Sequence, residues 1–114
     1  MAVGLGNYAL TSDAVGPLTA EKIFATRHIK SLAKEIDTDD LGEVTVIQTG
    51  VLGNTGIESS EQVKAIAERV TPQAIIAVDA LACSELSNLG RTIQLCNTGI
   101  SPGSGVENAR KELS

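Results

Sequence analysis

The sequence predicts a three-layer α/β sandwich built on a mainly parallel sheet. Short runs rich in apolar and β-branched residues, Glu43–Thr49 and Ala74–Val78, alternate with segments of helical period. The second run is continuously apolar, which is typical of a strand buried on both faces of a parallel sheet. With 114 residues, the chain has room for a single domain with a small core.

The positions of glycine and proline predict the first secondary-structure elements of the chain. Only three residues precede Gly4-Leu5-Gly6, too few for the strand that such a loop normally follows. We therefore expect the first strand to be missing and residues 1–114 to be one core domain truncated at both ends. Pro17 suits the first turn of a helix. One face of that single helix would carry the apolar residues Leu18, Ala25, Ile29, Leu32 and Ile36.

A glycine-rich turn and a second helix come next. The turn spans Gly50–Ile57. Ser59 and Gln62 have the spacing of a capping box, in which each side chain satisfies a backbone N–H at the start of a helix. The helix should then close before Pro72.

The last third of the chain is predicted to contain two short elements and a loop. We expect a short helix over about Ala80–Asn88, a strand over Arg91–Cys96, and a loop over Asn97–Gly105, which is rich in Gly, Ser and Pro. The alternation of strands and helices thus continues through the chain.

Composition and charge exclude several classes of protein. A net charge of −5 without a basic stripe argues against direct nucleic-acid binding. No apolar run approaches the roughly 20 residues of a membrane span, and no signal peptide opens the chain. Cys83 and Cys96 lack a framework of partners, which favours a reducing cytoplasm and a role as small buried hydrophobes.

Two aspartates are the candidate catalytic residues. Asp13 and Asp79 each follow an apolar, strand-like run and precede a predicted helix. In an open parallel sheet, ligands collect at the carboxyl ends of the strands. Two carboxylates meeting there could share a proton, so that one could act as base and the other as acid when water attacks an amide. The alternative is that both residues simply cap helices.

The sequence contains few residues that could bind a metal or an organic cofactor. His28 is the only histidine, and on one continuous helix it would lie about 22 Å from Asp13. A zinc or nickel site without histidine or clustered thiolates is poor. In a dinucleotide fingerprint, Ala9 would stand where the third glycine is needed. We therefore expect no metal and no cofactor.

Long motifs resemble the germination protease family of endospore-forming bacteria. The resemblance covers essentially the whole chain, in order. It rests on Val3–Asn7, Asp13–Pro17, Thr26–His28, Gly50–Glu61, Val78–Ala82, Thr92–Leu95, Asn97–Val106 and Arg110–Ser114.

The resemblance implies an atypical aspartic endopeptidase that starts the degradation of small acid-soluble spore proteins during germination. It implies a fold similar to that of the hydrogenase-maturation peptidases, a phosphorylase/hydrolase-like sandwich, and places the essential aspartates at Asp13 and Asp79. It also implies a homotetrameric zymogen in the cytoplasm of the forespore, the later spore core. The cleft would be walled by residues offering backbone N–H groups to a peptide: Gly53, Asn54, Thr55, Gly56, Gly103, Ser104 and Gly105.

Other classes of function stay open at this point. A hydrogenase-maturation-type peptidase would recruit nickel through acidic residues and a histidine. A peptide-binding module of the same fold would tolerate the loss of both aspartates. A catalytically silent fragment is the third alternative.

Overall fold

A computed structural model describes residues 1–32, 41–81 and 90–100. The three strands form one parallel sheet in the order β2-β1-β3, which confirms the predicted α/β class with a parallel sheet. The elements are β1 (Ala2–Gly4), the 3₁₀ helix η1 (Thr11–Asp13), α1 (Val15–Glu21), α2 (Arg27–Leu32), β2 (Val46–Gln48), α3 (Leu52–Thr55), α4 (Ser59–Val70) and β3 (Ile76–Val78).

The central strand is the first three-residue run of the chain. Val3 of β1 lies opposite Ile47 of β2 on one side and Ala77 of β3 on the other. The prediction that the first strand is missing is therefore wrong. A run this short holds its place because both edges of its backbone find hydrogen-bonding neighbours.

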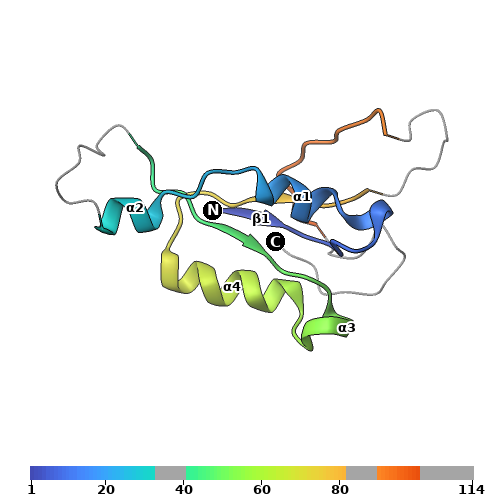
Figure 1. Cartoon of the computed structure of the whole chain (residues 1–114), viewed down its shortest axis with the longest axis horizontal. Coiled ribbons are helices and arrows are strands. Elements are labelled where there is room, and N and C mark those ends of the chain that lie inside the picture. Colours follow the sequence, from blue (N-terminus) through green and yellow to red (C-terminus); the bar gives the residue numbers. More distant parts are fainter. Residues whose placement is uncertain (33–40, 82–89, 101–114) are drawn as a thin grey trace.

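Helices cover both faces of the sheet. Successive side chains of a strand point to opposite faces. Val3 and Leu5 are buried and cluster with Val63 of α4. Gly4 faces α1, since a Cβ placed on it would lie 2.9 Å from the Cβ of Ala20. The sheet thus lies between α1 and α4 (Figure 1).

The first turn of α1 touches the ends of two strands. A Cβ placed on Gly16 would lie 2.0 Å from the carbonyl oxygen of Leu5 and 2.6 Å from that of Val78. Both atoms belong to the backbone at the strand ends, so they could make room for a side chain only if a strand moved. Glycine at this position is what allows α1 to approach β1 and β3 so closely.

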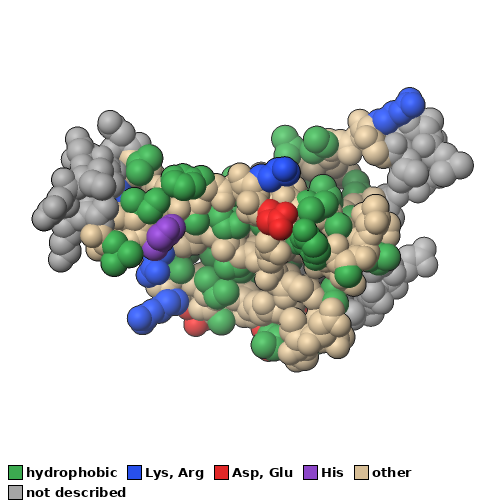
Figure 2. All heavy atoms as spheres, viewed as in Figure 1, with side chains coloured by type: hydrophobic (Ala, Val, Ile, Leu, Met, Phe, Trp, Pro, Cys, Tyr) green, Lys and Arg blue, Asp and Glu red, His purple; other side chains and the backbone are tan. Residues whose placement is uncertain are grey.

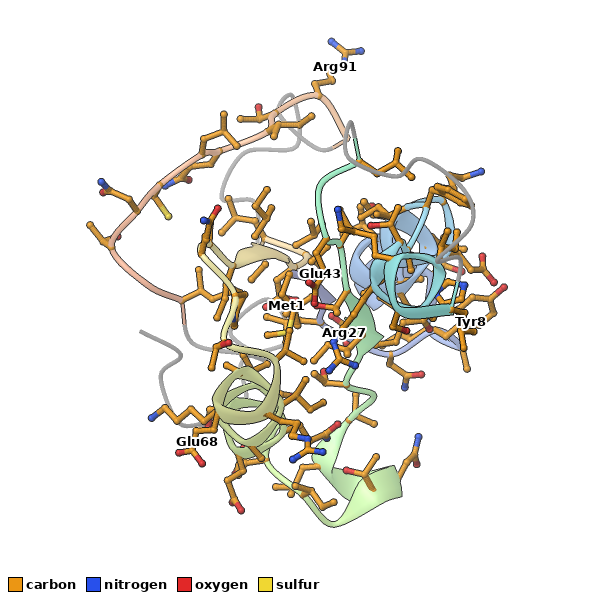
Figure 3. The ribbon with its side chains drawn as sticks, turned by 90° about the vertical axis from the view of Figure 1, so that its left-hand side faces the viewer. Met1, Tyr8, Arg27, Glu43, Glu68 and Arg91 are labelled. Atoms are coloured by element: carbon orange, nitrogen blue, oxygen red, sulfur yellow. The ribbon has the colours of Figure 1, made fainter. Side chains whose placement is uncertain are left out.

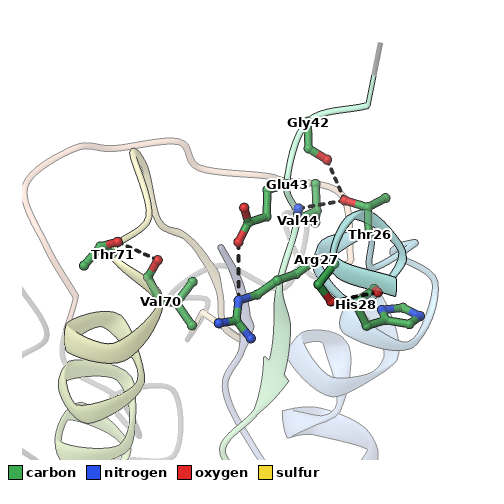
Figure 4. Close-up of polar contacts among 9 residues, drawn as sticks. Thr26, Arg27, His28, Gly42, Glu43, Val44, Val70 and Thr71 are labelled. Carbon is green, nitrogen blue, oxygen red and sulfur yellow. Dashed lines mark hydrogen bonds and ion pairs between the residues drawn. The ribbon is translucent and has the colours of Figure 1, made fainter. Parts of the chain in front are cut away.

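The predicted long helix is interrupted between Glu21 and Arg27. The backbone N–H of Thr26 donates to the carbonyl of Val44 at 3.0 Å, so it makes no bond within a helix. The Thr26 hydroxyl also accepts the N–H of Val44 at 2.8 Å. These bonds to the strand-side segment interrupt the helix between α1 and α2. Leu32 is exposed, and Ile36 lies outside the described residues. The Arg27–Glu43 ion pair joins the same two segments (Figure 4).

The capping box at the start of α4 does not form. The N-cap residue is Glu58, and it makes no side-chain capping bond. Instead the Ser59 hydroxyl donates to the Thr49 hydroxyl at 3.0 Å, and the Gln62 amide donates to the Thr49 carbonyl at 2.9 Å. Both side chains therefore bond to Thr49, a buried residue at the end of β2, and not to backbone N–H groups at the start of α4.

The predicted end of α4 is confirmed, and the turn before it contains one extra element. α4 stops at Val70, followed by Thr71 with a left-handed φ of 50° and then Pro72. Within the glycine-rich turn, α3 forms a single helical turn closed by Gly56, whose φ is 73°. Left-handed glycine is a common helix terminator.

The β3 side of the sheet is more exposed than predicted. Ile76 is 68% exposed, so β3 is not buried on both faces; it lies at the edge of the described sheet. Residues 91–96 form no strand, and Cys96 is exposed. This segment lies apart from the sheet (Figure 3) and pairs with no described strand. Most of the predicted helix over 80–88, with Cys83, and the loop beyond residue 100 lie outside the described residues.

Gly16→Ala should destabilise the fold strongly. The new methyl group would collide with two strand carbonyls, and overpacking of this kind costs about 1–3 kcal/mol. Gly53→Ala is the matched control, since a Cβ at Gly53 meets nothing within 4 Å. Urea unfolding followed by circular dichroism measures the two free energies of unfolding. Equal midpoints for the two variants would contradict the close approach of α1.

Candidate functional site

The carboxyl ends of the three strands lie side by side. The N–H of Leu5, just after β1, donates to the carbonyl of Val78 in β3 at 2.9 Å. The N–H of Thr49, just after β2, donates to the carbonyl of Gly4 in β1 at 3.3 Å. The chain passes from β1 to β2 on one side and reaches β3 on the other. The gap between β1 and β3 is therefore the point where strand order reverses, the usual ligand site of such sheets.

Asp13 is held over the end of β1. It closes η1 and is 5% exposed. The N–H of Asn7 donates both to its carboxylate Oδ2 and to its carbonyl, each at 3.0 Å. Gly6, with φ of 121°, passes so close that a Cβ there would lie 2.3 Å from the Asp13 carbonyl oxygen. The loop after β1 thus fixes the carboxylate by backbone contacts.

Asp13 is not the cap of α1. The N-cap residue of α1 is Ala14, and no side-chain capping bond is made there. The simpler alternative that this aspartate is a helix cap is therefore wrong. Its carboxylate stabilises the turn at Asn7 instead, and is buried beside the carboxyl edge of the sheet.

Asp79 directly follows β3 and is partly buried. Its Oδ1 accepts the N–H of Ala80 at 2.9 Å. The preceding carbonyl, that of Val78, is the one that Gly16 approaches. Asp13 and Asp79 therefore follow adjacent strands, and the first turn of α1 packs against the ends of both. Whether Asp79 also caps a helix depends on residues outside the described part.

The loop after β2 reaches the same edge (Figure 1). The predicted substrate-binding residues Gly53, Asn54, Thr55 and Gly56 are all exposed. The N–H groups of the last three donate within the loop, to the carbonyls of Val51 and Leu52. Any contact of these three with a peptide must therefore use side chains or carbonyls. The other predicted substrate-binding residues, Gly103, Ser104 and Gly105, lie outside the described residues.

The histidine lies far from this edge. His28 is on α2 and exposed, and α2 occupies the end of the molecule opposite η1 (Figures 1 and 2). Among the described residues, no three His, Cys, Asp or Glu side chains gather as metal ligands would. In the same part of the chain, no helix is long and apolar enough to cross a membrane.

An apolar hollow of about 270 Å³ lies elsewhere on the sheet. It is lined by Gly4 and Val78 together with Ala2, Ile76 and residues from the end of α1. These strand residues share the face that α1 covers only in part. Neither aspartate lines the hollow, so it is not the candidate site.

Sequence reasoning missed the residues that support Asp13. Gly16 and Gly6 leave room for the backbone, and Asn7 supplies the N–H that the carboxylate accepts. The only signal available was the concentration of glycines around Asp13. Their spacing matched no phosphate-binding motif, and its meaning depends on which backbones meet in three dimensions.

Comparison with known proteins places these residues in a family. The whole chain, residues 1–114, matches the family model described as germination protease. It is 50% identical to the germination protease of Clostridium tetani over 115 residues and 45% identical to that of Clostridium perfringens over 114. It is also 48% identical to that of Halalkalibacterium halodurans. All of the chain is covered in each case, but only 31% to 35% of the length of these relatives.

Asp13→Ala and Asp13→Asn should differ in stability. The asparagine retains an oxygen that accepts the Asn7 N–H, whereas alanine leaves the turn without its side-chain acceptor. Losing this bond should cost about 1 kcal/mol, and the asparagine variant should stay close to the parent. Urea unfolding of the three proteins measures the difference. Equal stability of the alanine variant and the parent would show that the carboxylate does not hold the turn.

Proposed function

The chain belongs to the germination protease family, and from this we infer that it forms the catalytic core of an endopeptidase acting in spore germination. We propose small acid-soluble spore proteins as its substrates and Asp13 and Asp79 as its catalytic pair. The observation that carries the proposal is the position of these two residues after the adjacent strands β1 and β3. The burial of Asp13 away from any helix cap supports it.

The proposed reaction is hydrolysis of a peptide bond by a carboxylate and a carboxylic acid. The ionised aspartate takes a proton from water as the water oxygen bonds to the carbonyl carbon. The protonated aspartate donates its proton to the leaving nitrogen as the carbon–nitrogen bond breaks. The pair thus supplies one base and one acid, as general acid–base catalysis requires. Either residue can take either role.

The loop after β2 is the proposed wall of the peptide cleft. It lies at the same edge as the two aspartates, and Asn54 at its tip is exposed. An exposed side-chain amide both donates and accepts hydrogen bonds, so it can pair with the backbone of an extended peptide. We propose Gly103, Ser104 and Gly105 as further residues of the cleft wall, which would offer backbone N–H groups to the peptide.

The remaining proposals concern the whole protein. We propose a homotetramer made as a zymogen, located in the forespore and spore core, with the phosphorylase/hydrolase-like fold that the hydrogenase-maturation peptidases share. The chain spans about a third of its relatives' length. The alternative is therefore a core that is catalytically silent or only binds peptides, and an activity assay distinguishes it from an active core.

Asp13→Asn and Asp79→Asn should each abolish cleavage while leaving the fold intact. Loss of a general acid or base should reduce the rate by at least about a hundredfold. The assay uses a chimera in which this chain replaces the matching segment of the Clostridium tetani germination protease. Purified small acid-soluble spore protein is the substrate, and the products are read by mass spectrometry.

Glu68→Gln is the control, because Glu68 is an exposed carboxylate on α4 (Figure 3). It should cleave like the parent chimera. Full activity in either aspartate variant would exclude the proposed pair. The 114-residue chain alone, assayed in parallel, distinguishes an active core from a silent one.

A further inference from the structure

One side chain bridges the base of the loop between β2 and α4. The Gln62 Nε2 atom lies 2.9 Å from the carbonyl oxygen of Thr49, just before the loop, and 3.5 Å from that of Ile57, at its end. Gln62 itself is in the first turn of α4. A single amide group on a helix thus contacts both ends of the loop.

Among the described residues, the backbone hydrogen bonds of this loop are mostly internal. Gly50 and Gly56 bound it with φ values of 69° and 73°, and glycine changes conformation more easily than other residues. The N–H groups of Asn54, Thr55 and Gly56 donate only within the loop. These bonds hold the shape of α3 but do not attach it to the sheet.

The base of the loop is well anchored to the body of the protein. Thr49 is 2% exposed, and its N–H donates to Gly4 of the central strand. The Ser59 hydroxyl, also buried, donates to the Thr49 hydroxyl. Gln62 therefore connects the loop to a rigid point beside β1, whose carboxyl end leads to Asp13.

We propose that Gln62 is a positioning residue that holds the loop over residues 50–57 as a wall of the peptide cleft. The inference rests on the proposed function. Gln62 acts through the Thr49 and Ile57 carbonyls. Its loss should therefore weaken binding of an extended peptide and leave the chemical step unchanged.

Gln62→Met tests this directly, since methionine keeps the length of the side chain but has no donor. In the chimera described above, KM for the spore protein should rise about five- to tenfold, the factor expected for one or two lost hydrogen bonds, with kcat within about twofold of the parent. Gln62→Glu should raise KM further, because a carboxylate would face two carbonyl oxygens. Glu68→Met, the same type of change at an exposed site of α4, should alter neither constant.

Ser59→Ala separates positioning from general stability. It removes the buried hydroxyl that donates to the Thr49 hydroxyl. It keeps the Thr49 carbonyl that Gln62 contacts and the Thr49 hydroxyl that donates to the Gly50 carbonyl, so it should lower the unfolding midpoint with little change in KM. Hydrogen exchange of residues 50–57 should accelerate in Gln62→Met and not in Ser59→Ala.

Other results would contradict either the positioning role of Gln62 or the proposed function. An unchanged KM in Gln62→Met, or a KM that rises equally in Ser59→Ala, would overturn the positioning role. A lower kcat at unchanged KM would do the same. If the parent chimera cleaves nothing, the proposed function fails, and the substrate role of Gln62 fails with it.

Discussion

The contact of Gly16 with the ends of β1 and β3 is the constraint on which the rest of the arrangement depends. Backbone meets backbone there, at distances that leave no space for a side chain. This contact seats α1 on the sheet and sets the position of the residues just before it, including η1 and Asp13. Because the same turn touches the carbonyl that precedes Asp79, one contact relates both candidate catalytic segments to each other.

Two buried threonines decide where the helices begin and end. Thr26 gives its N–H to Val44 and so separates α1 from α2. Thr49 accepts hydrogen bonds from Ser59 and Gln62, so the expected capping box does not form. Both lie beside β2, at its two ends. Hydrogen bonds to buried partners prevail over local helix signals here, because an unpaired buried polar group costs more than a weak helix terminus.

The β3 side of the described sheet is exposed. Within the described residues β3 is an edge strand with Ile76 largely exposed, and the apolar hollow lies against the same strand. Matched relatives are about three times as long as the segment that aligns. The candidate site, by contrast, lies at the carboxyl ends of β1 and β3.

Local patterns in the sequence were enough to predict the α/β class, the strand positions near Glu43–Thr49 and Ala74–Val78, the end of α4 and the two aspartates as candidates. These depend on local period, on proline and on the order of segments along the chain. Three features became visible only in the folded chain: Ala2–Gly4 is the central strand, the first helix is interrupted, and Ser59 and Gln62 bond to Thr49. Those outcomes depend on contacts between distant residues, whose energies exceed local propensity and leave no periodic pattern in the sequence.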